Sequence, residues 1–185
     1  MDKPIAVITG ASTGIGRSLA LKLSNQYLVY LISRNENNLN KTKELIKAQN
    51  NQCEIIVSDI SRTKSIDYIY SKIENKEKIE LLINNAGIGI FKNITDTSVE
   101  DWDRTLNTNL RGSFLMTKML IDNFKSKKNG KIVFISSVAG LQPYKNSTAY
   151  VASKYGVRGF AASLREELRE FNIKVITVFP GAVNT

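Results

Sequence analysis

The feature that most constrains the fold is an alternation of six apolar runs with segments of helical periodicity. The runs are IAVIT (5–9), YLVYLIS (27–33), EIIVSD (54–59), IELLINNAG (79–87), KIVFISS (131–137) and IKVITVFPG (173–181). Helices are expected after the first glycine-rich turn, from an Asn35 N-cap through Lys47, and over 62–75, 98–125 and 149–171. Because the strands are nearly continuous apolar runs, both faces of their sheet must be covered. The pattern predicts an α/β fold, a doubly wound parallel sheet (Rossmann fold) in one domain, 1–185.

Histidine and cysteine usage limits the chemistry open to this chain. It contains no histidine and one cysteine, Cys53. Ser-His-Asp and Cys-His nucleophile systems, His-based metal sites and thiolate clusters are therefore excluded, and no metal is expected. Acid–base chemistry must instead use Tyr, Lys, Asp or Glu. A lone cysteine, a short N-terminal apolar stretch and no run approaching 18 apolar residues predict a cytoplasmic protein without membrane contact.

The net charge of +9 raises the question of an anionic partner. The basic residues are spread along the chain and alternate with acidic and polar residues, as they do on solvated helix faces and loops. This distribution favours an anionic small ligand over nucleic acid. Salt-sensitive gel shifts without sequence preference would be the test of nucleic-acid binding.

The first strand is followed by the glycine-bearing loop TGASTGIGR (9–17). Gly10 permits a tight turn, Gly14 permits close approach to a pyrophosphate, and Gly16 permits close packing of the helix on the sheet. A phosphate-binding loop of nucleotide hydrolases is disfavoured, since Ala11 stands where its first glycine belongs and Arg17 replaces its lysine. A dinucleotide is therefore the expected ligand.

The end of the second strand indicates which dinucleotide. Arg34 stands where NAD-binding proteins place an acid for the ribose hydroxyl, and Arg17 begins the neighbouring helix. A guanidinium can bind a 2′-phosphate through two hydrogen bonds, whereas a carboxylate would repel it. Glu36 argues in the other direction, although it also suits the first turn of a helix. The balance predicts NADP(H).

A tyrosine–lysine pair is the strongest candidate for acid–base catalysis. Only Tyr150 has a lysine four residues later, Lys154, so both side chains lie on one helix face. Tyr144 precedes that helix and Tyr155 points elsewhere. A free phenol has a pKa of about 10, and a nearby cation stabilises its ionised form. The pair can therefore work without histidine.

Six motifs in this order resemble the short-chain dehydrogenase/reductase family over essentially the whole chain. They are TGxxxGxG (9–16), NNAG (84–87), NxxG (109–112), SSxxG (136–140), YxxxK (150–154) and PGxxxT (180–185). The resemblance implies that Tyr150 exchanges a proton with the substrate oxygen. It further implies that Lys154 lowers the pKa of Tyr150 and binds the nicotinamide ribose, that Ser137 hydrogen-bonds the substrate oxygen, and that Asn109 holds a water in the proton relay.

The cofactor-binding set combines the two arginines with positions implied by the resemblance. Within it, Asp59 would meet the adenine amine and Thr185 the nicotinamide carboxamide. The full set is Thr9, Gly10, Ser12, Thr13, Gly14, Ile15, Gly16, Arg17, Arg34, Asp59, Ile60, Asn85, Ala86, Gly87, Tyr150, Lys154, Pro180, Gly181, Val183 and Thr185.

The resemblance thus implies an oxidoreductase that transfers hydride between NADP(H) and a small carbonyl or alcohol substrate. The alternative is a non-catalytic NADP-binding sensor or scaffold subunit, whose usual sign would be a broken catalytic tetrad; here all four positions are intact. The substrate itself is not identified, because in this family its pocket is built largely from the segment after PGxxxT.

Two expectations concern assembly. The helix over 149–171 carries a seam of small residues, Ala152, Gly156, Gly159 and Ser163, which can pack within one subunit. The resemblance implies a homodimer or homotetramer instead, because the family often pairs this helix and the 98–125 helix across a two-fold axis. The family further implies that this sequence stops before a C-terminal substrate lid and the usual seventh strand. The sixth strand would then be an exposed apolar edge, unless another subunit covers it.

Overall fold

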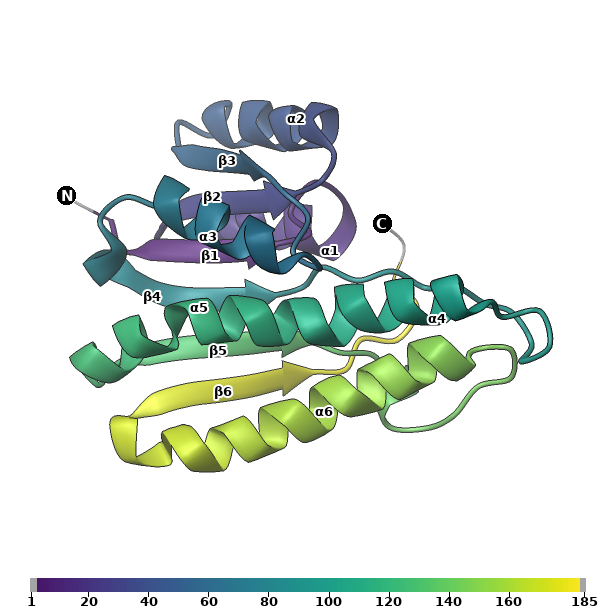
Figure 1. Cartoon of the computed structure of the whole chain (residues 1–185). Coiled ribbons are helices and arrows are strands. Elements are labelled where there is room, and N and C mark those ends of the chain that lie inside the picture. The colour runs from purple at the N-terminus through teal and green to yellow at the C-terminus, as the bar shows by residue number, and fades with distance from the viewer. Residues whose placement is uncertain (1–2, 184–185) are drawn as a thin grey trace.

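Six parallel strands form one sheet in the order β3-β2-β1-β4-β5-β6 in the computed structural model, which describes residues 3–183. In Figure 1 the strand arrows all point toward the same edge of the sheet. The strand order reverses between β1 and β4, which is where doubly wound sheets bind their ligands. The predicted fold class is therefore confirmed. The strands are β1 (Ile5–Thr9), β2 (Leu28–Ser33), β3 (Cys53–Val57), β4 (Ile79–Asn84), β5 (Gly130–Ile135) and β6 (Ile173–Val178).

Helices cover the sheet in two layers, and each layer encloses its own apolar core. The first core joins the sheet to Ala20, Leu39 and Ile46, which lie on α1 (Gly14–Leu23) and α2 (Glu36–Lys47). The second core joins it to α3 (Thr63–Lys72), α5 (Gly112–Lys127) and α6 (Thr148–Leu168). Strands buried from both sides explain the continuous apolar runs in the sequence.

The helix starts follow the capping chemistry of the sequence. The Asn35 side chain accepts a hydrogen bond from Asn38 N–H at 2.9 Å, and α2 ends at Lys47 as predicted. Ser98 likewise accepts from Asp101 N–H at 3.1 Å and caps α4 (Val99–Leu106). Each side-chain oxygen satisfies a backbone donor that lacks an intrahelical partner.

The prediction of one uninterrupted helix over 98–125 is wrong in one respect. Between α4 and α5 the chain makes a wider π-helical turn at Asn107–Arg111, where Gly112 N–H bonds to Asn107 C=O. Such a turn holds one extra residue and is frequent at functional sites. It contains Asn109, whose side chain is held by residues of other elements.

Strand β6 is an edge of the sheet, as expected. Ile173 and Val175 face the core, whereas Ile176 and Val178 are 43% and 41% exposed on the opposite face. Arg165 donates from Nε to Val175 C=O at 3.0 Å, which occupies one backbone acceptor of the strand. Within residues 3–183, no helix combines the length and the apolarity that crossing a membrane would require.

Candidate active site

A cavity of about 450 Å³ opens at the carboxyl ends of the strands, where the strand order reverses. It is lined by residues at the carboxyl ends of all six strands, by Thr108 and by Tyr150 of α6. The predicted site residues on its wall are Gly10, Ser12, Thr13, Gly14, Ile15, Arg34, Asp59, Ile60, Asn85, Ala86, Gly87, Ser137, Tyr150, Pro180, Gly181 and Val183. The lining residues that were not predicted are Ile32, Ser33, Ser58, Ile88, Thr108 and Ser136. Thr185 lies outside the described residues.

The glycine loop shapes one wall through its backbone. Gly10 and Gly14 adopt φ of 66° and 55°, a region that side chains disfavour. A Cβ on Gly16 would lie 2.2 Å from Gly10 C=O, so α1 can approach the loop only with glycine there. Among the described residues, no side chain caps the α1 N-terminus at Thr13. Its first N–H groups are therefore suited to an anion such as a pyrophosphate.

Thr9 joins the loops that follow β1 and β4. This fully buried residue accepts hydrogen bonds at Oγ1 from the N–H groups of Asn85 and Ala86, both at 3.0 Å. In return, Asn85 Nδ2 donates to the carbonyls of Thr9 at 2.9 Å and Gly10 at 3.2 Å. Thr9 and Gly16 do not line the cavity. They shape it indirectly, because Thr9 holds the loop after β4 and Gly16 lets α1 pack against Gly10.

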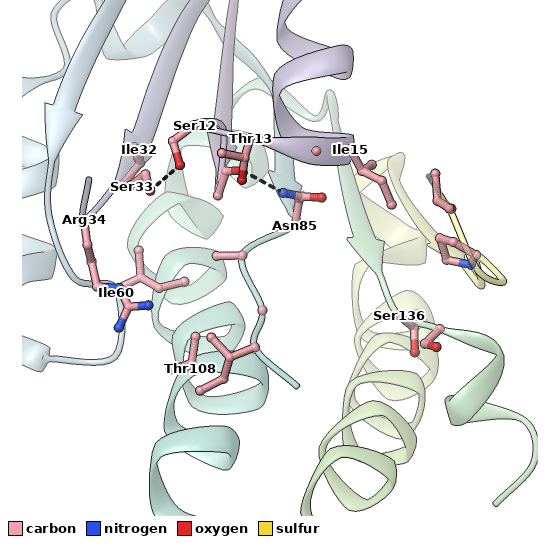
Figure 2. A pocket seen from close by; sticks show the side chains of 18 of the residues that line it. Ser12, Thr13, Ile15, Ile32, Ser33, Arg34, Ile60, Asn85, Thr108 and Ser136 are labelled. Atoms are coloured by element: carbon pink, nitrogen blue, oxygen red, sulfur yellow. Dashed lines mark hydrogen bonds between the residues drawn. The ribbon is translucent and has the colours of Figure 1, made fainter. Parts of the chain in front are cut away.

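The two arginines have different positions. Arg34 is exposed on the cavity wall, near Ile60 and the Ser12–Ser33 hydroxyl pair, whose oxygens are 2.9 Å apart (Figure 2). Arg17 does not line the cavity. Its guanidinium donates to Thr42 Oγ1 at 3.0 Å and to Ser12 C=O, which ties the glycine loop to α2. Arg34 is thus the cation available at this end.

Asp59 marks the same end of the cavity. Its Oδ1 accepts from both the N–H (3.0 Å) and the hydroxyl (2.7 Å) of Ser61. Burial by itself would raise the pKa of Asp59, but these bonds and the charges of Arg34 and Arg62 hold the pKa below its ordinary value. The carboxylate is therefore ionised at neutral pH and can accept a hydrogen bond from a ligand.

At the other end, Tyr150 lines the cavity while Lys154 is buried behind it. Lys154 is 5% exposed, and its Nζ donates to Ile135 C=O at 2.9 Å. The same Nζ lies 5.6 Å from the centroid of the Tyr150 ring. Burial lowers the pKa of Lys154 to about 8. At pH 7 about nine-tenths of the side chain is still a cation.

Two adjacent serines differ in what their hydroxyls can do. Ser136 donates to Lys154 C=O at 3.1 Å, which anchors α6 to the end of β5. Ser137 Oγ accepts from Ala139 N–H at 3.1 Å, a contact that uses a lone pair and not the hydroxyl proton. Both line the cavity (Ser136 is labelled in Figure 2). Ser137 is thus the better placed of the two to donate to a bound oxygen.

Asn109 lies in the π-turn, is 2% exposed and does not line the cavity. Its amide bonds to both backbone polar groups of Ile88 and to the hydroxyl of Ser153. Ser153 was not among the predicted site residues, nor were Ser113 and Thr117, which follow Asn109 at four-residue spacing on one buried helix face. Small polar residues at four-residue spacing within a helix are the sequence pattern from which a buried polar face next to Asn109 could have been predicted.

The small-residue seam on α6 divides into two parts. A Cβ on Gly156 would lie 2.7 Å from Leu110 Cδ2, so this glycine serves packing within the chain. A Cβ on Gly159 would meet no described atom within 4 Å, and both Gly159 and Ser163 are exposed. Only this outer part is open to a partner.

Comparison with known proteins agrees with the geometry. The family model for short chain dehydrogenases matches residues 4–185. Sepiapterin reductase of Chlorobaculum tepidum is 35% identical, with 99% of this chain and 79% of that protein covered. A metagenomic short-chain oxidoreductase in complex with NADP superposes with a TM-score of 0.93 at 32% identity, covering 99% of this chain and 84% of that one.

A second solved structure, an NAD+-bound xylitol dehydrogenase, also has a TM-score of 0.93, at 27% identity, covering 100% of this chain and 72% of that one. The fold is therefore shared by proteins whose solved structures hold different nicotinamide cofactors. Members of the matched family are oxidoreductases that bind a nicotinamide cofactor and act on small molecules. On the match of its sequence and of its fold, the chain belongs to the short-chain dehydrogenase family.

Proposed function

We propose that the protein is an NADP(H)-dependent oxidoreductase that interconverts a carbonyl and an alcohol, with Tyr150 as general acid and base. The observation that carries this proposal is the single cavity that unites two kinds of group. One end presents the glycine loop and Arg34, which suit a phosphorylated dinucleotide. The other end presents the phenol of Tyr150 and the hydroxyl of Ser137, which suit a carbonyl oxygen.

The bound cofactor would supply the hydride that reduces the carbonyl carbon. As the C=O π bond breaks, Tyr150 Oη gives its proton to the oxygen, and Ser137 Oγ donates a hydrogen bond that keeps this oxygen in place. The buried cation of Lys154 stabilises the phenolate that remains. Oxidation of an alcohol uses the same groups in reverse. Asn109 is assigned to the proton relay behind Lys154.

The preference for NADP(H) rests on charge at the end of β2. Arg34 is an exposed cation on the cavity wall at the position where an NAD-binding protein places a carboxylate. The solved metagenomic relative is a complex with NADP, whereas the solved xylitol dehydrogenase holds NAD+. We assign the remaining predicted cofactor contacts, including Asp59 to the adenine amine, on the match to the short-chain dehydrogenase family.

We further propose that the sheet and its helices form one dinucleotide-binding domain and that the chain assembles as a homodimer or homotetramer. The exposed part of the α6 seam, at Gly159 and Ser163, supports assembly. Mass measurement in solution is the test. A monomer at micromolar concentration would contradict the second statement.

A spectrophotometric screen tests the enzymatic proposal. NADPH oxidation is followed at fixed protein concentration against a panel of ketones, aldehydes and acyl thioesters, with NADH in parallel. With a good substrate, Tyr150→Phe is expected to lower kcat at least about 1000-fold, because among the described residues that line the cavity Tyr150 alone carries a phenol. NADPH affinity, measured by fluorescence titration, should change less than about 2-fold.

The matched control is Tyr155→Phe. This change removes the same hydroxyl from the same helix, but Tyr155 does not line the cavity, so its turnover should equal that of the wild type. Retention of turnover by Tyr150→Phe would reject the proposed mechanism. NADPH binding without any turnover across the panel would favour a sensor or scaffold instead.

A further inference from the structure

We propose that Ser153, which is not part of the predicted catalytic set, is a positioning residue that orients Asn109 and, through Asn109, the cavity wall at residues 85–88. Its kinetic consequences rest on the proposed function, but its effect on the protein without cofactor does not. Ser153 lies on α6 between Tyr150 and Lys154 and is fully buried. It therefore cannot contact a ligand directly.

The hydroxyl of Ser153 has a defined direction. Its Oγ donates its one proton to Tyr150 C=O at 2.7 Å. The same oxygen lies 2.9 Å from Asn109 Nδ2, and with its proton already used it can only accept there. Ser153 thus requires a donor from Asn109 and excludes the opposite orientation of that amide.

Asn109 passes this constraint to the loop after β4. Its Nδ2 also donates to Ile88 C=O at 2.9 Å, and its Oδ1 accepts from Ile88 N–H at 2.8 Å. If the amide rotated by a half turn, its oxygen would face two acceptors, Ser153 Oγ and Ile88 C=O. Loss of the Ser153 acceptor removes one of the contacts that prevent this rotation.

The loop held in this way is the wall of the cavity beside Lys154. Residues 85–88 all line the cavity. A Cβ at Gly87 would lie 3.3 Å from Asn109 Oδ1 and 3.5 Å from Lys154 Nζ, so the loop backbone passes close to both side chains. Displacement of Asn109 therefore changes the distance between this wall and the buried ammonium group.

Ser153 provides the hydrogen bond that joins α6 to Asn109. Ser113 Oγ donates to the backbone carbonyl of Asn109 at 2.9 Å, but it belongs to the same continuous helical segment. The Ser153–Asn109 bond instead joins residues 44 positions apart and connects α6 to the π-turn. It ties the helix that carries Tyr150 and Lys154 to the loop that completes the cavity.

The first experiment measures hydrogen–deuterium exchange of the Ile88 amide in the full chain without cofactor. Asn109 Oδ1 protects this amide, so Ser153→Ala is expected to speed its exchange about 10-fold, the loss of about one net hydrogen bond. In an Asn109→Ala background the Ser153→Ala change should alter exchange less than about 2-fold, because the intermediary is gone. Equal effects in both backgrounds would overturn the proposal.

The second experiment measures kcat for the same single and double variants at Ser153 and Asn109. Ser153→Ala should lower kcat about 10-fold with an unchanged KM for the carbonyl, and again have no further effect beside Asn109→Ala. The matched control is Thr105→Val, which removes another buried hydroxyl bonded to a helix carbonyl (Thr105 Oγ1 to Asp101 C=O, 2.7 Å). It should leave Ile88 exchange and kcat at wild-type values.

Ser153→Cys guards against the cavity that the alanine variant leaves, since sulfur is larger than oxygen and fills the site but accepts hydrogen bonds only weakly. Its exchange rate should lie between those of the wild type and Ser153→Ala. Wild-type exchange at Ile88 in both variants would overturn the proposal. If Ser153→Ala speeds Ile88 exchange in the wild-type background but not beside Asn109→Ala, and no carbonyl is turned over, the result would count against the proposed function alone.

Discussion

The two ends of the cavity are built in different ways. The end beside β1, β2 and β3 is made of short consecutive segments, 10–15, 32–34 and 58–60, and its shape depends on backbone conformation at Gly10 and Gly14. The end beside β4, β5 and β6 depends on buried polar side chains that join distant residues, such as Asn109 with Ser153. Added side-chain volume should therefore disrupt the end beside β1, β2 and β3, whereas loss of polar atoms should disrupt the end beside β4, β5 and β6.

The largest effect is expected from adding a methyl group at the first end. Gly16→Ala would place Cβ 2.2 Å from Gly10 C=O, a backbone atom that cannot move alone. We expect a loss of about 3 kcal/mol in the free energy of unfolding and a loss of NADPH binding. Urea denaturation measures the first quantity and fluorescence titration the second.

Within one subunit Gly159→Ala is the matched control, because its added Cβ would meet no described atom of the chain within 4 Å, and it is measured at a protein concentration where the chain is monomeric. In a helix interior this change should be neutral or stabilise by up to about 1 kcal/mol. If both glycine variants were equally stable, the close packing of α1 on the glycine loop would not limit the fold.

At the second end, the burial of Lys154 should appear as a pH dependence of stability. The folded chain releases the proton of Lys154 near pH 8, whereas the unfolded chain holds it up to the ordinary pKa of 10.5. Between these values the unfolded state binds more protons, so stability rises with pH. The burial penalty is fully present below pH 8 and is relieved as the pH approaches 10.5.

Lys154→Met removes this titration. We expect the stability of the wild type relative to Lys154→Met to increase by about 2 kcal/mol from pH 7 to pH 10. Denaturation at the two pH values measures the change, and titrations elsewhere in the chain cancel in the comparison. A difference that stays constant with pH would show that the folded pKa of Lys154 is not lowered.

Thr9 connects the two ends and should give an intermediate effect. Thr9→Val keeps the shape but removes the oxygen that accepts from the N–H groups of Asn85 and Ala86. Because these amides are only partly buried, we expect a loss of about 1.5 kcal/mol in unfolding free energy. Hydrogen exchange of the two amides should accelerate, and unchanged exchange would mean that the loops are held by other contacts.

The smallest effect is expected at the exposed cation of the first end. Arg34→Glu should shift the ratio of kcat/KM for NADPH over NADH about 10-fold toward NADH, and the shift should shrink at high salt. Arg62→Glu makes the same charge change on a side chain that does not line the cavity, and it should leave the ratio near that of the wild type. Similar shifts in both variants would mean that Arg34 acts through the overall charge of the protein and does not contact the 2′-phosphate.

Local patterns in the sequence predicted most of the first end. The limits of β1 and α2 and the caps Asn35 and Ser98 follow from apolar periodicity and from side chains that bond their own backbone neighbours. The edge of the sheet at which the cavity lies could be predicted because parallel strands end at one edge, whereas most individual wall residues were named from the resemblance to the short-chain dehydrogenase/reductase family. Arg17 is the exception: its partner Thr42 lies on another helix, and that contact turns its guanidinium away from the cavity wall.

The sequence by itself therefore determined the order of strands and helices, the edge at which the cavity lies and the residue types available for chemistry. Only the tertiary structure decided the π-turn at Asn109, the burial that lowers the pKa of Lys154 and the link through Ser153. The physical reason is that periodicity reports which face of an element is buried, whereas a hydrogen-bond partner or a desolvated charge depends on what the rest of the chain places opposite it.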